Sequence, residues 1–312
     1  MSLDPQAKAL LEAVEQSGAP PFNAYSAQEA RIVYDQASDL VRGDPPKPFS
    51  IEEIEIPGSG GSIPAWIYRP SEQPRFPILV YFHGGGYTIG SLKSHDCICR
   101  GLCVEAECIV VSVDYRLAPE NKYPAAVEDA WDAARWVAAN AVALGGDPDK
   151  VAIGGDSAGG NLTAVVSLLA KENGSPDFVF QLLVYPGTDM TCSFESHNKF
   201  GNGYRLTNEL IAWFYAHYFT EGDDITHWKA SPLNAEDLSD LPPAFMISAG
   251  FDPLQDENRA YAEKLKSAGV SVKHSHYGGM IHGFLTMPGA LDKAREGINE
   301  CAQELRDAFN SD

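Results

Sequence analysis

Residues 151–160 read VAIGGDSAGG and contain the pattern Gly-x-Ser-x-Gly around Ser157. A short apolar strand precedes the pattern, and a helix is predicted directly after it, over residues 158–171. A serine at such a junction sits on a tight turn, which lifts its hydroxyl clear of the sheet. The pattern therefore predicts that Ser157 is a nucleophile rather than a serine that caps the helix. Asp156 adjoins it, and its side chain is expected to point away from the turn.

Apolar runs and helical patterns alternate along the rest of the chain. The predicted strands are 51–56, 63–69, 78–82, 108–113, 151–154, 179–185, 244–249 and 271–277. From the third onward most are almost continuously apolar, as in a parallel sheet that is covered on both faces. Further helices are predicted at 126–144, 254–268 and 290–309. The alternation predicts an α/β fold with a mostly parallel sheet and helices on both faces.

Two stretches interrupt this alternation. Residues 1–45 are helical in pattern and precede the first strand, whereas residues 187–240 hold a polar segment followed by the aromatic helix IAWFYAHYF. We expect the two stretches to pack together as a cap over the carboxyl edge of the sheet. Residues 46–186 and 241–312 are then the two parts of one catalytic domain.

A second glycine-rich stretch, His83-Gly84-Gly85-Gly86, directly follows the third predicted strand. Glycines leave their amide N–H groups open to a ligand because no Cβ blocks the approach. Acyl transfer needs such donors where negative charge develops on the carbonyl oxygen, and this loop accompanies the serine turn in esterases. The candidate donors of this oxyanion hole are Gly84, Gly85, Gly86 and Ala158, with Gly85 and one adjacent glycine favoured. We expect His83 to hold the loop by hydrogen bonds.

The general base and its carboxylate partner are expected after the serine, in the order Ser, Asp or Glu, His. Asp252 follows the buried strand AFMISAG, and His282 is the histidine that follows the last strand, where such folds place catalytic groups. Asp256 and Glu257 compete with Asp252, but both fall on the next helix. The other later histidines are assigned to the cap or to the last strand: His197, His217, His227, His274 and His276. The predicted catalytic triad is Ser157, Asp252 and His282.

Five motifs, taken in this order, resemble the hormone-sensitive lipase family of bacterial esterases, also called family IV. They are HGGG at 83–86, YRLAPE at 115–120, GDSAGG at 155–160, DPL at 252–254 and HGF at 282–284. The resemblance implies an α/β-hydrolase fold with eight strands, a cap, and hydrolysis of short- to medium-chain acyl esters without metal or cofactor. It also implies a supporting role for Glu120. A lipase, a carbohydrate deacetylase, an amidase and a non-catalytic ligand-binding protein are the alternatives.

The aromatic residues of the cap helix have two open interpretations. They limit the size of the acyl group, or they form the core of the cap, as aromatic runs on helices usually do. The residues concerned are Trp213, Phe214, Tyr215 and Tyr218.

Composition narrows the class of partner. The 312 residues include 43 acidic and 23 basic side chains, for a formal net charge of −20. Such a surface repels phosphate and anionic lipid, so we expect a neutral ester as substrate, no nucleic acid and no stable membrane association. The pattern lacks a membrane span and a signal peptide, which favours the cytoplasm, and it leaves a homodimer open. Four clustered cysteines match no C-x2-C spacing and are interpreted as buried apolar residues rather than a zinc site: Cys97, Cys99, Cys103 and Cys108.

Overall fold

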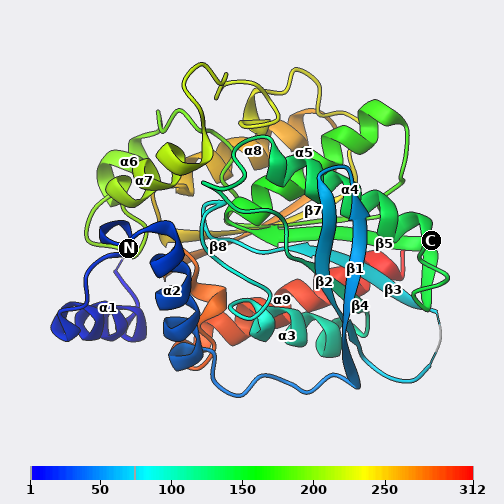
Figure 1. Cartoon of the computed structure of the whole chain (residues 1–312), viewed down its shortest axis with the longest axis horizontal. Helices are drawn as coiled ribbons and strands as arrows, with labels where there is room; N and C mark the ends of the chain where they lie inside the picture. The colour runs from blue at the N-terminus through cyan, green and yellow to red at the C-terminus, as the bar shows by residue number, and fades with distance from the viewer. Residues whose placement is uncertain (1, 74, 312) are drawn as a thin grey trace.

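An eight-stranded sheet forms the centre of the molecule in the computed structural model, which describes residues 2–73 and 75–311 (Figure 1). Its strands are β1 (Ser50–Gly58), β2 (Gly61–Arg69), β3 (Phe76–Phe82), β4 (Ile109–Val113), β5 (Gly146–Asp156), β6 (Gln181–Val184), β7 (Ala244–Phe251) and β8 (Val272–Ile281). They lie in the order β1-β2-β4-β3-β5-β6-β7-β8. β1 pairs antiparallel with β2, which pairs antiparallel with β4, and all remaining pairs are parallel.

Helices cover both faces of this sheet, which explains why its central strands are apolar along their whole length. One face carries α3 (Asp96–Ala106) and α9 (Asp292–Phe309), and the other carries α4 (Ala125–Ala139), α5 (Ala158–Asn173) and α8 (Gln255–Ser267) (Figure 1). The predicted mostly parallel α/β architecture is therefore confirmed. α4 ends earlier than predicted, because residues 140–145 form turns that are closed by a hydrogen bond from Gly146 N to Ala141 O (2.8 Å).

The chain outside the sheet and its covering helices comes from the N-terminal segment and from the insertion between β6 and β7. It includes α1 (Pro5–Ser17), α2 (Ala27–Val41), α6 (Glu195–Phe200) and α7 (Asn208–Tyr218). α2 and α7 lie on the same side of the molecule (Figure 1) and share an apolar cluster that includes Ala30, Tyr34, Leu210 and Phe214. α1 instead contacts the main domain, since its N-cap residue Asp4 donates from N to Gly279 O (3.0 Å) and Gln6 Nε2 donates to Asp292 Oδ2 (3.0 Å). The division of the chain into cap and catalytic parts stays a prediction.

Within residues 2–73 and 75–311, no helix is both long enough and apolar enough to cross a bilayer.

Candidate active site

Ser157 lies between the end of β5 and the first residue of α5. Its backbone has φ 55° and ψ −115°, a conformation that L residues rarely adopt. The flanking glycines are required by space, because a Cβ on Gly155 would overlap Gly159 O and a Cβ on Gly159 would overlap Phe82 O. Strain of this kind persists where the surrounding structure enforces it, and it is concentrated at functional sites.

Asp252 and His282 meet Ser157 because each follows the carboxyl end of a strand: β7 ends at Phe251 and β8 ends at Ile281. His282 Nε2 lies 2.8 Å from Ser157 Oγ, and His282 Nδ1 lies 2.7 Å from Asp252 Oδ2. A carboxylate only accepts, so the proton of the neutral imidazole sits on Nδ1, and Nε2 is free to accept from the serine hydroxyl. Asp252 is fully buried, and its second oxygen accepts from Leu254 N (2.9 Å).

The competing side chains are engaged elsewhere. Asp256 accepts from Ser196 N (3.0 Å), and His217 contacts the carbonyl of its own helix at Trp213 (2.8 Å). His274 and His276 both contact the buried hydroxyl of Ser248. Burial lowers the pKa of His274 to about 4, so it stays neutral near pH 7.

The hydrogen bonds made by the glycine loop after β3 distinguish the N–H groups that are free to bind an oxyanion from those that are not. Gly84 N donates to Asp156 Oδ1 (3.1 Å) and faces His95 Nε2 (3.2 Å), so this N–H is already taken. This removes Gly84 from the predicted donor set. Gly85 and Gly86 have φ 125° and 56°, which favour glycine. Among the described residues, the N–H groups of Gly85, Gly86 and Ala158 have no hydrogen-bond partner within the protein.

Asp156 contacts this loop through Gly84, a role that the sequence alone does not reveal. It is 2 % exposed and accepts from Tyr81 Oη (2.8 Å) as well as from Gly84. Burial opposes its ionisation, but the neighbouring His95 and the hydrogen bond from Tyr81 outweigh burial and lower the pKa of Asp156. An ionised carboxylate therefore anchors the loop. Asp156 was visible in GDSAGG, whereas His95 lies in no recognisable motif.

His83 supports the same loop from the other side. Its Nδ1 donates to Gly84 O (2.8 Å), and its ring stacks on Tyr115 with centroids 4.4 Å apart. Tyr115 Oη in turn donates to His83 O (2.7 Å). Burial lowers the pKa of His83 to about 3, so the imidazole is neutral.

A small cavity of about 60 Å³ opens beside Ser157 and His282. Of the four aromatic residues on the cap helix, Phe214 lines this cavity, and a Cβ on Gly86 would overlap its ring. Tyr218 instead stacks on Tyr87 in the main core, with centroids 3.9 Å apart. Tyr218 is therefore a core residue, whereas Phe214 lies at the cavity, and a role of Phe214 in limiting the acyl group stays a prediction. The apolar wall consists of Phe22, Ile89, Leu206, Leu210 and Phe214.

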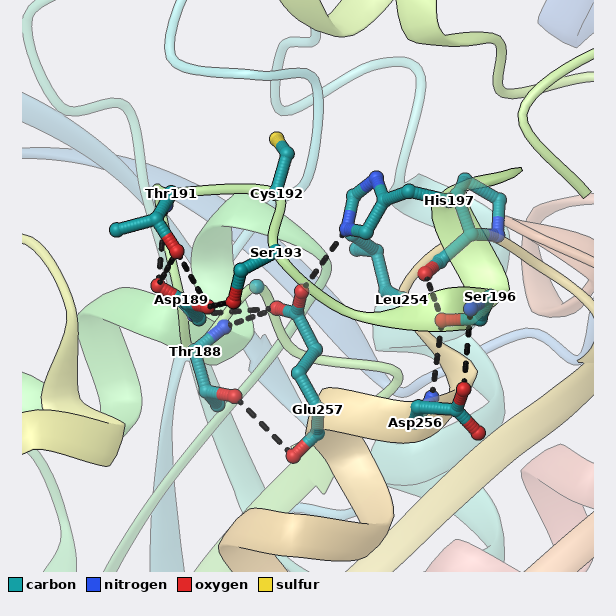
Figure 2. Close-up of polar contacts among 12 residues, drawn as sticks. Thr188, Asp189, Thr191, Cys192, Ser193, Ser196, His197, Leu254, Asp256 and Glu257 are labelled. Carbon is teal, nitrogen blue, oxygen red and sulfur yellow. Dashed lines mark hydrogen bonds and ion pairs between the residues drawn. The ribbon is translucent and has the colours of Figure 1, made fainter. Parts of the chain in front are cut away.

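Glu257, which competed with Asp252 for the role of catalytic carboxylate, instead contacts residues of the insertion (Figure 2). It is fully buried, and its Oε1 accepts from Thr188 N (2.6 Å) and Asp189 N (3.2 Å), at the start of the insertion. Its Oε2 lies 3.3 Å from His197 Nε2 on α6. Burial lowers the pKa of His197, but Cys192 and Glu257 outweigh burial and raise it to about 10. Burial raises the pKa of Glu257 in turn, and this hydrogen-bonded pair ties the insertion to the helix that follows Asp252.

A second charged contact joins the N-terminal segment to the main domain. Arg31 on α2 binds both carboxylate oxygens of Glu120 (3.1 and 2.6 Å) and donates to Thr88 O (2.8 Å) and Ala118 O (2.7 Å). The bonds from Arg31 lower the pKa of Glu120 to about 2. Glu120 thus supports the position of α2 and does not contact the triad.

The cysteines and the acidic residues form no metal site in the parts of the chain that the structure describes. All six cysteines are free. Burial raises the pKa of Cys97 and Cys103 to about 12, so these thiols are neutral and behave as small apolar groups.

Three comparisons show that the chain is similar to known hydrolases in sequence and fold. The model of a family described as alpha/beta hydrolase fold matches residues 79–286. The chain is 46% identical to the carboxylic ester hydrolase LipN of Mycobacterium tuberculosis over 82% of this chain and 70% of the relative. It is 38% identical to an ethyl acetate hydrolase of Pseudomonas putida over 98% of this chain and 99% of that relative. The crystal structure of a hyperthermophilic esterase from Pyrobaculum calidifontis superposes with a TM-score of 0.94 at 41% identity, covering 98% of this chain and 99% of the other.

The chain therefore belongs to the α/β-hydrolase family. Within that family it is a carboxylic ester hydrolase of the hormone-sensitive lipase group, which confirms the resemblance seen in its motifs.

Proposed function

We propose that this enzyme hydrolyses short- to medium-chain acyl esters through an acyl-enzyme formed on Ser157. The observation that carries the proposal is the continuous line of hydrogen bonds from Ser157 through His282 to Asp252. The small volume of the cavity, bounded by Phe214, supports a short acyl group. A relative named ethyl acetate hydrolase supports the same size class.

In the first half of the reaction, Ser157 Oγ forms a bond to the ester carbonyl carbon while His282 Nε2 takes the hydroxyl proton. The carbonyl electron pair moves onto oxygen. Asp252 keeps the imidazole in the required tautomer and stabilises the imidazolium. The intermediate then collapses, the bond to the alcohol oxygen breaks, and the alcohol leaves with the proton from His282.

The oxyanion of each intermediate accepts hydrogen bonds from Gly85, Gly86 and Ala158. These donors are fixed before the substrate arrives, so they lower the barrier without reorganisation, and one such donor contributes about 10²–10³ in turnover. In the second half, water attacks the acyl-enzyme and His282 takes its proton. The proton returns to Ser157 Oγ as the carboxylic acid leaves.

The direct test is Ser157→Ala, which removes the atom that becomes acylated. We expect turnover of 4-nitrophenyl butyrate to fall by at least about 10⁴-fold, because residues of a triad act as a unit. Labelling by a fluorophosphonate probe should disappear together with turnover. A Ser157→Ala protein that keeps wild-type turnover would refute the assignment.

The acyl-length preference is tested with a series of 4-nitrophenyl esters. We expect the highest kcat/KM between butyrate and octanoate, since Phe214 and the other apolar side chains of the cavity wall restrict the space for the acyl group. A maximum at palmitate would favour the lipase alternative.

We also propose a cytoplasmic location, which the free cysteines support because thiols persist in a reducing compartment. A homodimer stays a prediction.

A further inference from the structure

Arg205 lies between α6 and α7, beside the catalytic base. It lines the same cavity as Ser157 and His282. A Cβ on Gly283, the residue after His282, would lie 3.6 Å from Arg205 Nε. Arg205 thus lines the space beside Ser157 that a bound substrate would occupy.

The charge of Arg205 is not balanced by an acid, which is unusual in this chain. Nine of the eleven arginines have a carboxylate oxygen within 4.0 Å, and among the described residues the two exceptions are Arg205 and Arg306. The chain carries 43 acidic residues, so an unpaired arginine in its catalytic cavity is not explained by a shortage of partners.

The contacts that Arg205 does make leave most of its donors free. One N–H of Nη1 faces the sulfur of Met287 (2.6 Å), and sulfur is a weak acceptor. The guanidinium carbon lies 6.0 Å from the ring centroid of Tyr34, another residue of the cavity wall. Asp156 is the carboxylate that lines the cavity, and its oxygens are occupied by Tyr81, Gly84 and His95.

We propose that Arg205 binds a carboxylate carried by the substrate, so that the substrate class includes esters with a second, ionised carboxyl group. This inference rests on the proposed function and narrows it. A guanidinium presents a planar fork of N–H donors that matches a carboxylate, and such charge-assisted bonds are stronger than neutral ones. The class differs from the neutral ester expected from net charge. A direct contact inside the cavity outweighs the repulsion from the net negative charge of the protein, because salt screens that repulsion beyond about 8 Å.

The test compares matched pairs of esters. Mono-4-nitrophenyl adipate carries a carboxylate in its acyl part and is compared with 4-nitrophenyl hexanoate. 4-Acetoxybenzoate carries a carboxylate in its leaving group and is compared with its neutral methyl ester. The measured quantity is the ratio of kcat/KM for the anionic ester to that for its neutral match, in the wild type, Arg205→Met and Arg205→Lys.

We expect Arg205→Met to lower this ratio by about 10- to 100-fold for one of the two pairs, as the loss of a charged hydrogen bond implies. The pair affected identifies which side of the ester carries the carboxylate. Arg205→Lys keeps the charge and should retain most of the ratio. Added salt should lower the ratio in the wild type but not in Arg205→Met. Arg306→Met is the matched control, because it removes the other arginine without a carboxylate partner among the described residues, which lies on α9 and does not line the cavity, and it should leave the ratio unchanged.

An unchanged ratio for both pairs in Arg205→Met would overturn the inference. In that case, hydrolysis of the neutral esters by the wild type would leave the proposed function standing. A wild type that hydrolyses none of the four esters would instead count against the proposed function itself.

Discussion

Replacing Glu257 with alanine tests whether its carboxylate holds the insertion to the helix that follows Asp252. The change leaves the N–H groups of Thr188 and Asp189 without an acceptor and His197 without its charged partner (Figure 2). Breaking a buried charge pair on one side costs about 3–5 kcal/mol, and each orphaned donor about 1–3 kcal/mol. Because these costs overlap, we expect a loss of about 4 kcal/mol in the free energy of unfolding.

A conservative variant separates charge from hydrogen bonding. In Glu257→Gln the amide oxygen still accepts from Thr188 and Asp189, and the charge facing His197 is lost. We therefore expect a loss of about 3 kcal/mol, smaller than in Glu257→Ala because the two N–H groups keep an acceptor while the charge facing His197 is lost. Glu263 lies exposed on the same helix, and Glu263→Ala is the control, with an expected change below about 0.5 kcal/mol.

The assay is urea unfolding at pH 7, followed by circular dichroism, with thermal unfolding as a second measure. A loss of about 4 kcal/mol corresponds to a fall in Tm of roughly 6 °C for a chain of 312 residues. Turnover of 4-nitrophenyl butyrate, measured well below Tm, should fall in parallel with looser placement of Asp252. A Glu257→Ala protein within about 1 kcal/mol of the wild type would refute the reasoning.

Three further predictions concern the loops around the site. Asp156→Asn removes the charge that anchors Gly84, so kcat should fall about tenfold or more with little change in KM; an unchanged kcat contradicts this. His83 has a folded pKa of about 3 against 6.5 when unfolded, so its contribution to stability is present above pH 6.5 and is lost as pH falls toward 3. Urea midpoints at pH 7 and pH 4.5 should differ accordingly. Arg31→Ala removes a half-exposed ion pair and should lower the free energy of unfolding by only about 1 kcal/mol. It should nevertheless speed proteolysis within residues 1–45, and equal proteolysis rates in the variant and the wild type would argue against a role of Arg31 in docking α2.

The sheet and the order of the site residues could be predicted because they depend on local patterns. Apolar runs mark the strands, and the residues directly after β5, β7 and β8 share one edge of a parallel sheet. Ser157, Asp252 and His282 occupy these positions, and the structure brings them within hydrogen-bonding distance. The family could be recognised for the same reason, because each of the five motifs is a short local pattern.

The donors of the oxyanion hole could not be separated by sequence, since all three glycines of the loop are alike. The structure distinguishes them through His95 and Asp156, which come from distant parts of the chain and take the N–H of Gly84. Glu257 was missed for a related reason. It lies on α8 and binds residues of the insertion, and the insertion carries no motif that predicts these partners.

The bonds between the insertion and α8 also bear on how the enzyme matures. Ser196 Oγ donates to Pro253 O (2.6 Å), next to Asp252, and Glu257 accepts from the first residues of the insertion. A nascent chain that has built its sheet but not yet seated these residues would therefore be ordered and still inactive. During refolding, turnover should therefore appear later than the sheet. The time at which turnover begins then reports when the insertion has docked, as the final step of assembly.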